Sequence, residues 1–580
     1  MTGRRPSCQG AHMAAADWVP GLKAVSTYRP AWLPKDVIAG IVLTTLLVPQ
    51  GMAYAELAGL PAITGLYTSV LCLLGYAVFG PSRVLVLGPD SSLGPMIAAV
   101  ILPIVASDGD PAKAIALASM LGLLVGVFMT AAGVLKLGFI ADLLSHPTQL
   151  GYVNGLALTI LIGQLPKLFG FSVDGDGLIE ETTGFIRGVA AGETVPAALA
   201  VGAGGLLVIL LLRRFLPKIP GILIAVAGGI LAVVVLGLTD DGVDVVGPLP
   251  QGFPPFTVPT VSWSDLGLLA AGALGITLVS VTDTISTASA FAERTGQEVR
   301  GNQEMIGIGT ANLAAGLFQG FPVSTSGSRT AVAFTAGARS QLTGVVGAGA
   351  ITLMLVFVPG LLKDLPQPML AAVVIAASLS LADPAGLRRL WRQRRIEFGL
   401  AVAAFLGVAL LGVLPGIAVA VALSVLNVFR RVWWPYQAVL GRAEGVDGYH
   451  DLREYPGAER IPGLVMFRFD APLIFANART FREEIRRLAH ADPAPRWILV
   501  AAEPITDVDT TAADMLEDLD EELNAAGISL VFAEMKSPVR TKIDRYGLTR
   551  TIDPAHFYPT IEEAVAAYRM ISSLPEEPAT

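Results

Sequence analysis

Cysteine and charged residues are both scarce in this chain of 580 residues, and each scarcity removes a class of protein. The only cysteines are Cys8 and Cys72, so neither a disulfide framework nor a cysteine-based metal cluster is available. Charged residues make up 15% of the chain, whereas hydrophobic residues make up 53%, and the mean hydropathy is +0.62. This composition excludes an ordinary soluble protein of this length and predicts a membrane protein.

Catalytic and nucleic-acid-binding patterns are missing as well. No Ser/His/Asp order, metal-ligand spacing or phosphate-binding glycine loop stands out, and the chain has five histidines. No basic tract indicates nucleic acid. The start of the chain lacks the basic segment, apolar segment and small-residue cleavage site that follow one another in a signal peptide. Trp18, Tyr28 and Trp32 lie among basic residues and indicate an interfacial segment instead. We expect no enzyme, no cofactor, no nucleic-acid partner and a cytoplasmic N-terminus.

Long apolar segments fill the chain between Asp36 and Val432. We place about fourteen membrane spans there, several of them short or broken by proline and glycine. Basic residues then fall in cytoplasmic connections, as at 388–395 and 430–431, and the acidic loop 239–264 falls outside. The predicted centres of the spans are Leu43, Leu71, Ala98, Val125, Ala157, Leu206, Ala227, Ile276, Ile308, Ala331, Ile351, Val374, Phe405 and Val421.

The two halves of this apolar region contain a faint repeat. Pro89 and Pro322 are 233 positions apart, and each precedes small polar residues and then an apolar helix. Gln50 and Asp283, which interrupt comparable apolar runs, are separated by the same 233 positions. Seven spans in each half is an odd number, so the second half is predicted to be inverted relative to the first, as in many secondary transporters.

The stretch Gly320–Thr330 predicts an anion site. Pro322 can end one helix, and the Ser/Thr cluster after it can cap the next, which leaves free N–H groups at its start. At the middle of a bilayer those N–H groups and the guanidinium of Arg329 would attract an anion without competition from water. Asp90, on the corresponding half of the repeat, either caps a helix, pairs with Arg329 or takes a proton.

Asp283 is predicted to couple transport to a cation. A carboxylate at bilayer depth is costly unless it is paired or faces water, so its presence indicates a function. Ser280, Asp283 and Thr287 share one helical face and offer oxygen ligands suited to a hard cation such as Na⁺. A proton is the equal alternative, and a structural ion pair between Asp283 and Arg329 is the third.

Beyond Tyr436 the pattern changes to that of a small α/β domain. Residues 464–469, 497–500 and 529–532 read as strands, and amphipathic helices separate them. Asp509 is the expected N-cap of the second helix, and Gly527 follows its end.

Several motifs of the apolar part occur together and in order, at 48–55, 58–61, 65–67, 79–83, 322, 328–332 and 336–339. In the soluble part, 507–512 form a strand-to-helix loop. Together these motifs resemble the SulP/SLC26 family of anion transporters from about Trp32 to Tyr568, and the soluble part resembles the STAS domain of that family.

The resemblance implies a polytopic helical membrane domain with a 7+7 inverted repeat, core and gate domains, elevator-like alternating access and a homodimer. We accordingly expect multi-pass insertion in a bacterial-type inner membrane with both termini cytoplasmic. The expected parts are an interfacial segment 1–35, a transport domain 36–435, a STAS domain 436–572 and a disordered tail 573–580.

By position, the family's binding residues fall on Gln50, on the backbone around Ser91–Ser92 and Ser326–Gly327–Ser328, and on Arg329. The Asp283/Thr287 pair resembles the cation site of sodium-coupled bicarbonate members. Thr511 aligns with a serine that is phosphorylated in stand-alone STAS proteins, where a cytoplasmic regulator would act.

The expected function is Na⁺- or H⁺-coupled transport of sulfate or bicarbonate. The alternatives are a C4-dicarboxylate transporter of the same family and a channel-like or signalling protein with little net transport.

Overall fold

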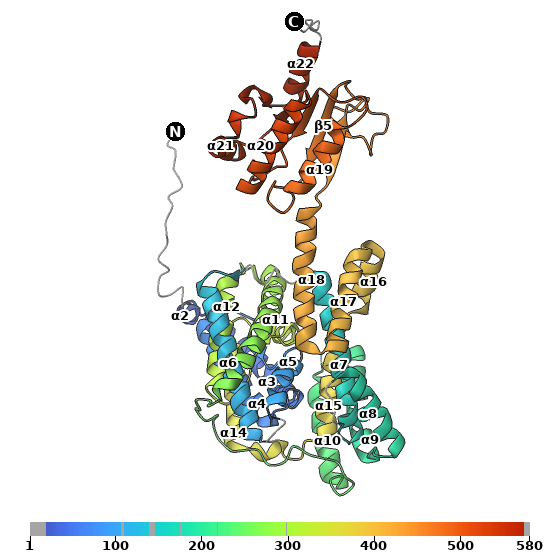
Figure 1. The fold of residues 1–580 in the computed structure, drawn as a ribbon. Helices are drawn as coiled ribbons and strands as arrows, with labels where there is room; N and C mark the ends of the chain where they lie inside the picture. Colours follow the sequence, from blue (N-terminus) through green and yellow to red (C-terminus); the bar gives the residue numbers. More distant parts are fainter. Residues whose placement is uncertain are drawn as a thin grey trace, which may run out of the picture. The chain divides into compact units, whose positions relative to one another are not determined.

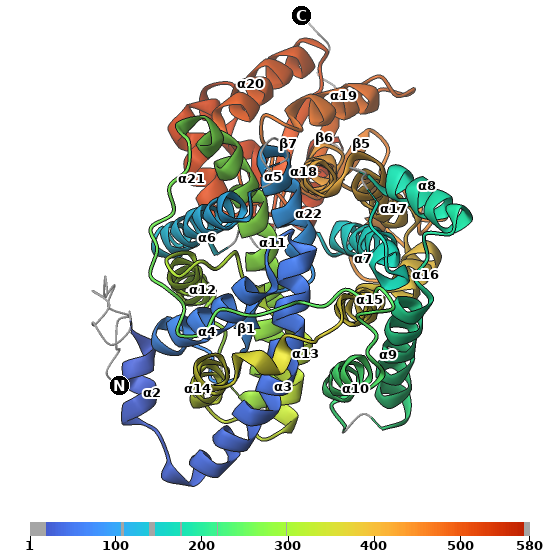
Figure 2. The same ribbon diagram turned by 90° about the horizontal axis from the view of Figure 1, so that it is seen from below.

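The computed structural model describes residues 19–105, 110–138, 145–173, 177–216, 219–296 and 298–572. The predicted interfacial residue Trp18 and the predicted tail 573–580 lie outside this part of the chain. The chain divides into two units, Met1–Ser424 and Val425–Thr580, drawn in Figures 1 and 2.

The first unit is built almost entirely of helices. Each of the predicted span centres falls in a different helix, which accounts for the apolar runs seen in the sequence. The first half contains α2 (Pro20–Ser26), η1 (Pro30–Trp32), α3 (Leu33–Leu57), α4 (Ala62–Phe79), α5 (Gly94–Val105), α6 (Pro111–Val134), α7 (His146–Phe169), α8 (Leu178–Ala191), α9 (Pro196–Phe215) and α10 (Gly221–Leu236). The second half contains α11 (Trp263–Thr295), α12 (Gly301–Gly316), α13 (Gly327–Thr335), α14 (Leu342–Phe357), η3 (Pro359–Leu362), α15 (Gln367–Leu381), α16 (Pro384–Gln393) and α17 (Arg395–Leu411), and α18 (Val413–Trp433) continues into the second unit.

Several of these helices are long and apolar enough to cross a bilayer. Among the described residues there are seven such segments, and α5, α10 and α14 are shorter apolar helices. The chain is therefore a multi-pass membrane protein, and the total of fourteen spans stays a prediction.

Two short strands hold the half-helices of the predicted repeat together. β1 (Leu87–Gly88) precedes α5, and β2 (Ser324–Thr325) precedes α13. The strands pair antiparallel, with Gly88 opposite Ser324. Pairing satisfies backbone groups that have no helical partner where the chain is extended, as a membrane interior requires. The starts of α5 and α13 are thereby brought to the same place.

A glycine contact fixes α3 beside α4. A Cβ atom on Gly65 would lie 1.9 Å from the carbonyl oxygen of Gly51, so the two backbones touch. Such close approach is available only to glycine and is typical of membrane helix pairs. Pro49, which cannot donate an N–H to the helix, lies two residues before this contact. The helix is continuous through Pro49, and this part of α3 is held in place by α4.

The second unit is an α/β domain with a six-stranded sheet of order β4-β3-β5-β6-β7-β8. The predicted strands are confirmed as β5 (Leu464–Phe469), β6 (Trp497–Ala501) and β7 (Ser529–Ala533), which run parallel. Strand β3 (Gln437–Gly441) and the two edge strands, β4 (His450–Asp451) and β8 (Phe557–Tyr558), were not predicted. The remaining elements are α19 (Ala478–Ala489), α20 (Thr510–Ala525), α21 (Ser537–Tyr546), η4 (Leu548–Arg550), η5 (Pro554–His556) and α22 (Ile561–Ser572).

Apolar side chains cover both faces of this sheet, as the nearly continuous hydrophobic strands predict. One cluster joins the sheet to α19, α20 and α21 and includes Phe467, Phe481 and Leu519. The other joins it to α22 and includes Leu499 and Tyr568.

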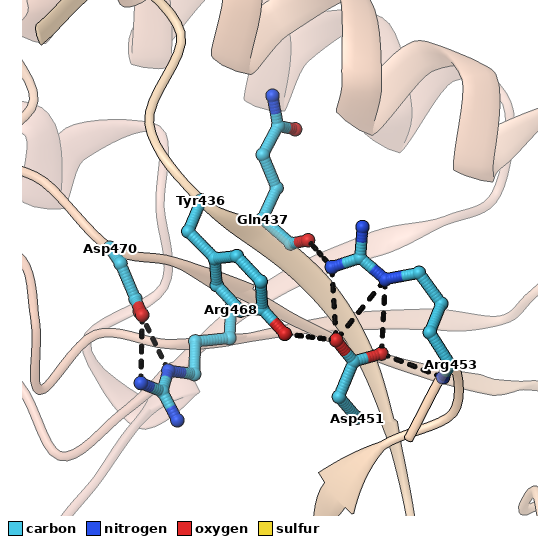
Figure 3. Close-up of polar contacts among 6 residues, drawn as sticks. All are labelled: Tyr436, Gln437, Asp451, Arg453, Arg468 and Asp470. Atoms are coloured by element: carbon cyan, nitrogen blue, oxygen red, sulfur yellow. Dashed lines mark hydrogen bonds and ion pairs between the residues drawn. The ribbon is translucent and has the colours of Figure 1, made fainter. Parts of the chain in front are cut away.

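A charged cluster fixes the antiparallel strands at the beginning of the domain (Figure 3). The hydroxyl of Tyr436 donates to the carboxylate of Asp451, and Arg453 Nη2 donates to Asp451 Oδ2 at 2.9 Å. Hydrogen bonds from Arg453 lower the pKa of Asp451 to about 2. Arg468 and Asp470 form a second pair beside it, at 2.6 Å from Nε to Oδ1. The Tyr436 hydroxyl thus ties the segment that enters the sheet to β4, and Asp470 N, which donates to the Tyr436 carbonyl oxygen at 2.9 Å, ties it to the end of β5.

Candidate functional site

Arg329 lies in the first turn of α13 and is 1% exposed. Its Nη2 is 3.6 Å from Asp90 Oδ2, so the pairing considered from sequence is present and Asp90, rather than Asp283, is the partner. Its guanidinium also packs on β1, since a Cβ atom on Gly88 would lie 2.8 Å from Nη1. Within the described protein none of its three guanidinium nitrogens makes a hydrogen bond. A buried guanidinium with unfilled donors is suited to accept an anion.

Asp90 also caps the turn that leads into α5. Its Oδ1 accepts hydrogen bonds from Ser92 N at 3.0 Å and from Ser92 Oγ at 2.8 Å. Residues 91–93 form this turn, and the α-helix itself begins at Gly94. Ser91 and Ser92 are both buried beside it. The Asp90 carboxylate therefore links the starts of the two half-helices, one oxygen on α5 and the other near Arg329.

Asp283 on α11 lies close to the same place. Its Oδ2 is 3.4 Å from Ser92 Oγ, and its Oδ1 is 3.5 Å from Gln149 Nε2. Both contacts are at the long end of hydrogen-bond distances and are weak. Ser92 therefore lies between two carboxylates, those of Asp90 and Asp283. This geometry leaves Asp283 able to take up a cation or a proton.

The other two residues of the predicted cation site, Ser280 and Thr287, also lie on α11 and face the segment that contains β2 and the start of α13. Ser280 is buried and donates to the carbonyl oxygen of Val323 at 3.2 Å, directly before β2. Thr287 lies near the start of α13, since a Cβ atom on Gly327 would be 3.9 Å from Thr287 Oγ1. No group of three or more His, Cys, Asp or Glu side chains that could hold a metal ion occurs in the described ranges.

The start of α13 is open. The Oγ of Ser326 accepts from Arg329 N at 3.5 Å, and the Ser326 and Ser328 hydroxyls are 3.1 Å apart. Gly327 and Ser328 are exposed, although Arg329 directly after them is buried. The N–H groups of a first helical turn have no partner within their helix. An approaching anion would thus meet these N–H groups and then the guanidinium.

Gln50 occupies the face of α3 that turns to the site. Leu47, one turn before it, packs 3.4 Å from the position of a Cβ on Gly88, and Tyr54, one turn after it, lies near Asp90, Ser91 and Arg329. Residues three and four apart share a helical face. Gln50 itself is half-buried.

Two residues of α7 complete the site, and the sequence analysis missed both. Gln149 contacts Asp283, as described above. Tyr152 is buried near Asp283 and Asp90, and its hydroxyl has no hydrogen-bond partner in the part of the chain that the structure describes. The available signal was the polar run His146–Gln149 at the start of an apolar helix.

A separate cavity of about 600 Å³ lies between the end of α3 and the end of α7. Its polar lining comprises Glu56, Thr64, Tyr67, Lys167, Gln319 and Gln367, and none of the predicted site residues lines it.

Thr511 is exposed at the second position of α20. Asp509 caps this helix by accepting from Ala512 N at 2.8 Å, and Gly527 follows it with φ +73°, so both predicted ends are confirmed. A role of Thr511 in regulation stays a prediction.

Family models match both units. Residues 33–404 match the model described as "Sulfate permease family", and residues 455–564 match that of the STAS domain. A probable sulfate transporter of Mycobacterium tuberculosis (strain CDC 1551 / Oshkosh) is 42% identical over 558 residues, which cover 96% of this chain and 99% of that protein. The chloroplastic sulfate transporter 4.1 of Arabidopsis thaliana is 30% identical over 575 residues, with 95% and 83% covered.

Solved structures support the fold. The murine Solute Carrier 26 family member A9 anion transporter in its inward-facing state is 24% identical, with a TM-score of 0.88 and coverage of 98% of this chain and 96% of that one. The transmembrane domain of the cyanobacterial bicarbonate transporter BicA is 22% identical, with a TM-score of 0.60 and coverage of 68% and 98%. The predicted fold class, a helical membrane domain followed by a STAS domain, is confirmed.

Proposed function

This chain belongs to the sulfate permease family, the SulP/SLC26 transporters, and from that membership we propose that it is a secondary active transporter of a small oxyanion. Sulfate is the first candidate, because relatives that cover nearly the whole chain carry the name of sulfate transporters. Bicarbonate is the second, by likeness to the fold of a bicarbonate transporter. The observation that carries the proposal is the buried guanidinium of Arg329 at the paired starts of α5 and α13.

The anion is held by complementary charge. The first-turn N–H groups of the two half-helices carry partial positive charge and need acceptors, and Arg329 adds a full charge with unfilled donors. The hydroxyls of Ser326 and Ser328 and the amide of Gln50 would supply further contacts. An oxyanion has acceptor oxygens on all sides and can use donors that converge in this way.

Charge balance favours coupling to a cation. Asp90 and Asp283 bring two negative charges to the site, and Arg329 brings one positive charge. Adding sulfate would leave an excess of three negative charges within the membrane unit. Uncompensated charge is costly at bilayer depth. A Na⁺ at Asp283 and Thr287, or a proton on Asp283, would offset part of this charge, so the anion and cation bind together.

Alternating access would move the half-helices past α7. The contact between Gln149 and Asp283 is long, and the hydroxyl of Tyr152 has no partner in the described protein. Polar contacts between α7 and the site can therefore form and break during transport. In this proposal α3, α5, α11 and α13 belong to an elevator-like core, and α7 belongs to the gate. The proposal includes a homodimer in a bacterial-type inner membrane with both termini cytoplasmic, and regulation through the STAS domain at Thr511.

Uptake into proteoliposomes tests this function. The purified chain is reconstituted, and labelled sulfate, bicarbonate and succinate are offered under imposed sodium or proton gradients. We expect sulfate or bicarbonate to accumulate above its outside concentration under one of the gradients. Accumulation of succinate alone would instead assign a C4-dicarboxylate transporter. Equilibration without accumulation under every gradient would contradict coupled transport and favour a channel-like protein.

A further inference from the structure

The α16 helix and the first residues of α17 form a basic surface that anion transport does not use. Five arginines lie within eight positions there, and all of them are exposed: Arg388, Arg389, Arg392, Arg394 and Arg395. In the described chain, only Arg394 of these five has a carboxylate within 4.0 Å, that of Glu397 at 3.1 Å. The surface therefore keeps a strong excess of positive charge. We call these five arginines the α16 basic surface.

The opposite side of α16 is apolar and is fixed to the membrane unit. Leu390 is buried in a cluster with Leu150 of α7 and Ala401 of α17. The start of the helix is fixed too, since the side-chain oxygen of Asn154 accepts from Asp383 N at 2.9 Å. Arg388, Arg389 and Arg392 share one helical face, whereas Leu387, Leu390 and Trp391 share another. The amphipathic helix thus has a set orientation.

The position of α16 in the chain places it at the membrane surface. It connects α15 and α17, two apolar helices of the membrane unit, and Figure 1 shows it beside α17. A short connection between two such helices lies at the membrane surface. Trp391 is 52% exposed. Its ring meets that of Phe398 edge-on, with 4.9 Å between the ring centroids, and the guanidinium carbon of Arg395 lies over the Trp391 ring, 5.4 Å from its centroid. An exposed tryptophan next to arginine is typical of the headgroup region.

We propose that the α16 basic surface binds the headgroups of anionic phospholipids. The phosphates pair with the arginines, and Trp391 with the exposed Ile396 faces the upper acyl chains. With the topology proposed above this is the cytoplasmic leaflet. The bound lipid holds α7 and α17, which α16 contacts, while the half-helices move. Lipid binding at α16 does not require the transported anion, which in the proposed function binds at a different place.

Lipid binding by the full chain in neutral detergent tests the proposal. The dissociation constant for fluorescently labelled phosphatidylglycerol is measured by anisotropy, with phosphatidylcholine carrying the same label as the neutral lipid. Each arginine near an anionic lipid surface favours binding by about five-fold, so R388Q/R389Q/R392Q is expected to bind phosphatidylglycerol roughly 100-fold more weakly. We expect no saturable binding of phosphatidylcholine.

The matched control is R460Q/R545Q/R550Q, which removes the same charge from exposed positions of the second unit. Its affinity for phosphatidylglycerol is expected to equal that of the unaltered protein.

Unchanged affinity of R388Q/R389Q/R392Q for phosphatidylglycerol would overturn the proposal. Equal weakening by the control triple variant, or equal binding of phosphatidylcholine, would also overturn it. In any of those cases the arginines would serve only to orient the chain in the membrane. Because sulfate uptake is not measured, failure of this proposal and failure of the transport proposal are distinguishable.

Discussion

The pair of Asp90 and Arg329 admits two roles that a single substitution cannot separate. Arg329 is buried and 3.6 Å from Asp90, so it could serve only to neutralise that carboxylate. Its unfilled donors argue for a second task. A buried ion pair is weak support for stability, whereas removal of one partner is strongly destabilising. The distinction therefore requires removal of both charges.

We expect Arg329→Ala to lose labelled-sulfate uptake and also to lose about 3 kcal/mol of stability, because Asp90, 14% exposed, loses its ion-pair partner and keeps only its hydrogen bonds with Ser92. The double variant Asp90→Asn/Arg329→Ala should recover most of the thermal stability but none of the uptake. Thermal unfolding and uptake are measured on the same preparations. Recovery of uptake in the double variant would show that Arg329 has only a structural role.

Asp283→Asn keeps the size of the side chain and removes its charge. We expect it to abolish accumulation of sulfate driven by a sodium or proton gradient, because no cation is then required at this position. Thermal stability should change little. Asp241→Asn, in the exposed connection after α10, is the control. Gradient-driven accumulation by Asp283→Asn at the rate of this control would remove Asp283 from the coupling step.

Tyr152→Phe removes only a hydroxyl that has no partner in the described protein. If this hydroxyl contacts the anion during transport, KM for sulfate should rise about 10-fold, the value of a hydrogen bond to a charged group. Tyr67→Phe, in the separate cavity, should leave KM unchanged. Equal KM values for the two variants would exclude Tyr152 from the transport site.

At the scale of elements, proline and small polar residues made the half-helices predictable. Pro89 and Pro322 mark the breaks, and Ser326 supplies the expected cap. The two-residue strands β1 and β2 leave no periodicity in the sequence, and the same holds for β4 and β8 at the sheet edges. Gln149 and Tyr152 were missed because they lie about 130 residues from Asp283 in the chain, and local patterns do not encode such long-range proximity.

The helix α20 should be sensitive to pH. Asp520 is buried on it, accepts from Asn524 Nδ2 at 2.9 Å, and burial raises its pKa to about 6. A carboxyl group with a raised pKa in the folded state favours folding while it is protonated, and that contribution is lost as pH rises through about 6.

We therefore expect α20 to lose about 1 to 2 kcal/mol of local stability between about pH 5 and about pH 7.5. Hydrogen–deuterium exchange of the α20 amides in the full chain, corrected for the intrinsic effect of pH, measures this change. Asp520→Asn should remove the pH dependence, and Asp514→Asn, on the exposed side of α20, should keep it. A pH dependence that persists in Asp520→Asn would contradict the assignment.

At the scale of the molecule, hydrophobic periodicity and charge distribution were enough to predict both units. The apolar runs gave the helices of the membrane unit, and the change of composition near Tyr436 marked the α/β domain. In the proposed function, the choice of anion and of coupling cation depends on the distances between a few side chains, which the sequence does not state. The structure brings Asp90, Ser92, Asp283 and Arg329 together from three distant segments, and this cluster is the basis of the proposed function.

Equilibrium binding of labelled sulfate to the purified full chain tests the central claim most directly. The unaltered protein should bind sulfate saturably, and Arg339→Ala, which alters an exposed arginine just beyond α13, should bind it equally well. Arg329→Ala and the charge-balanced Asp90→Asn/Arg329→Ala should both show no saturable binding. Binding by the double variant with the affinity of the unaltered protein would contradict an anion site built on Arg329 and the paired half-helices.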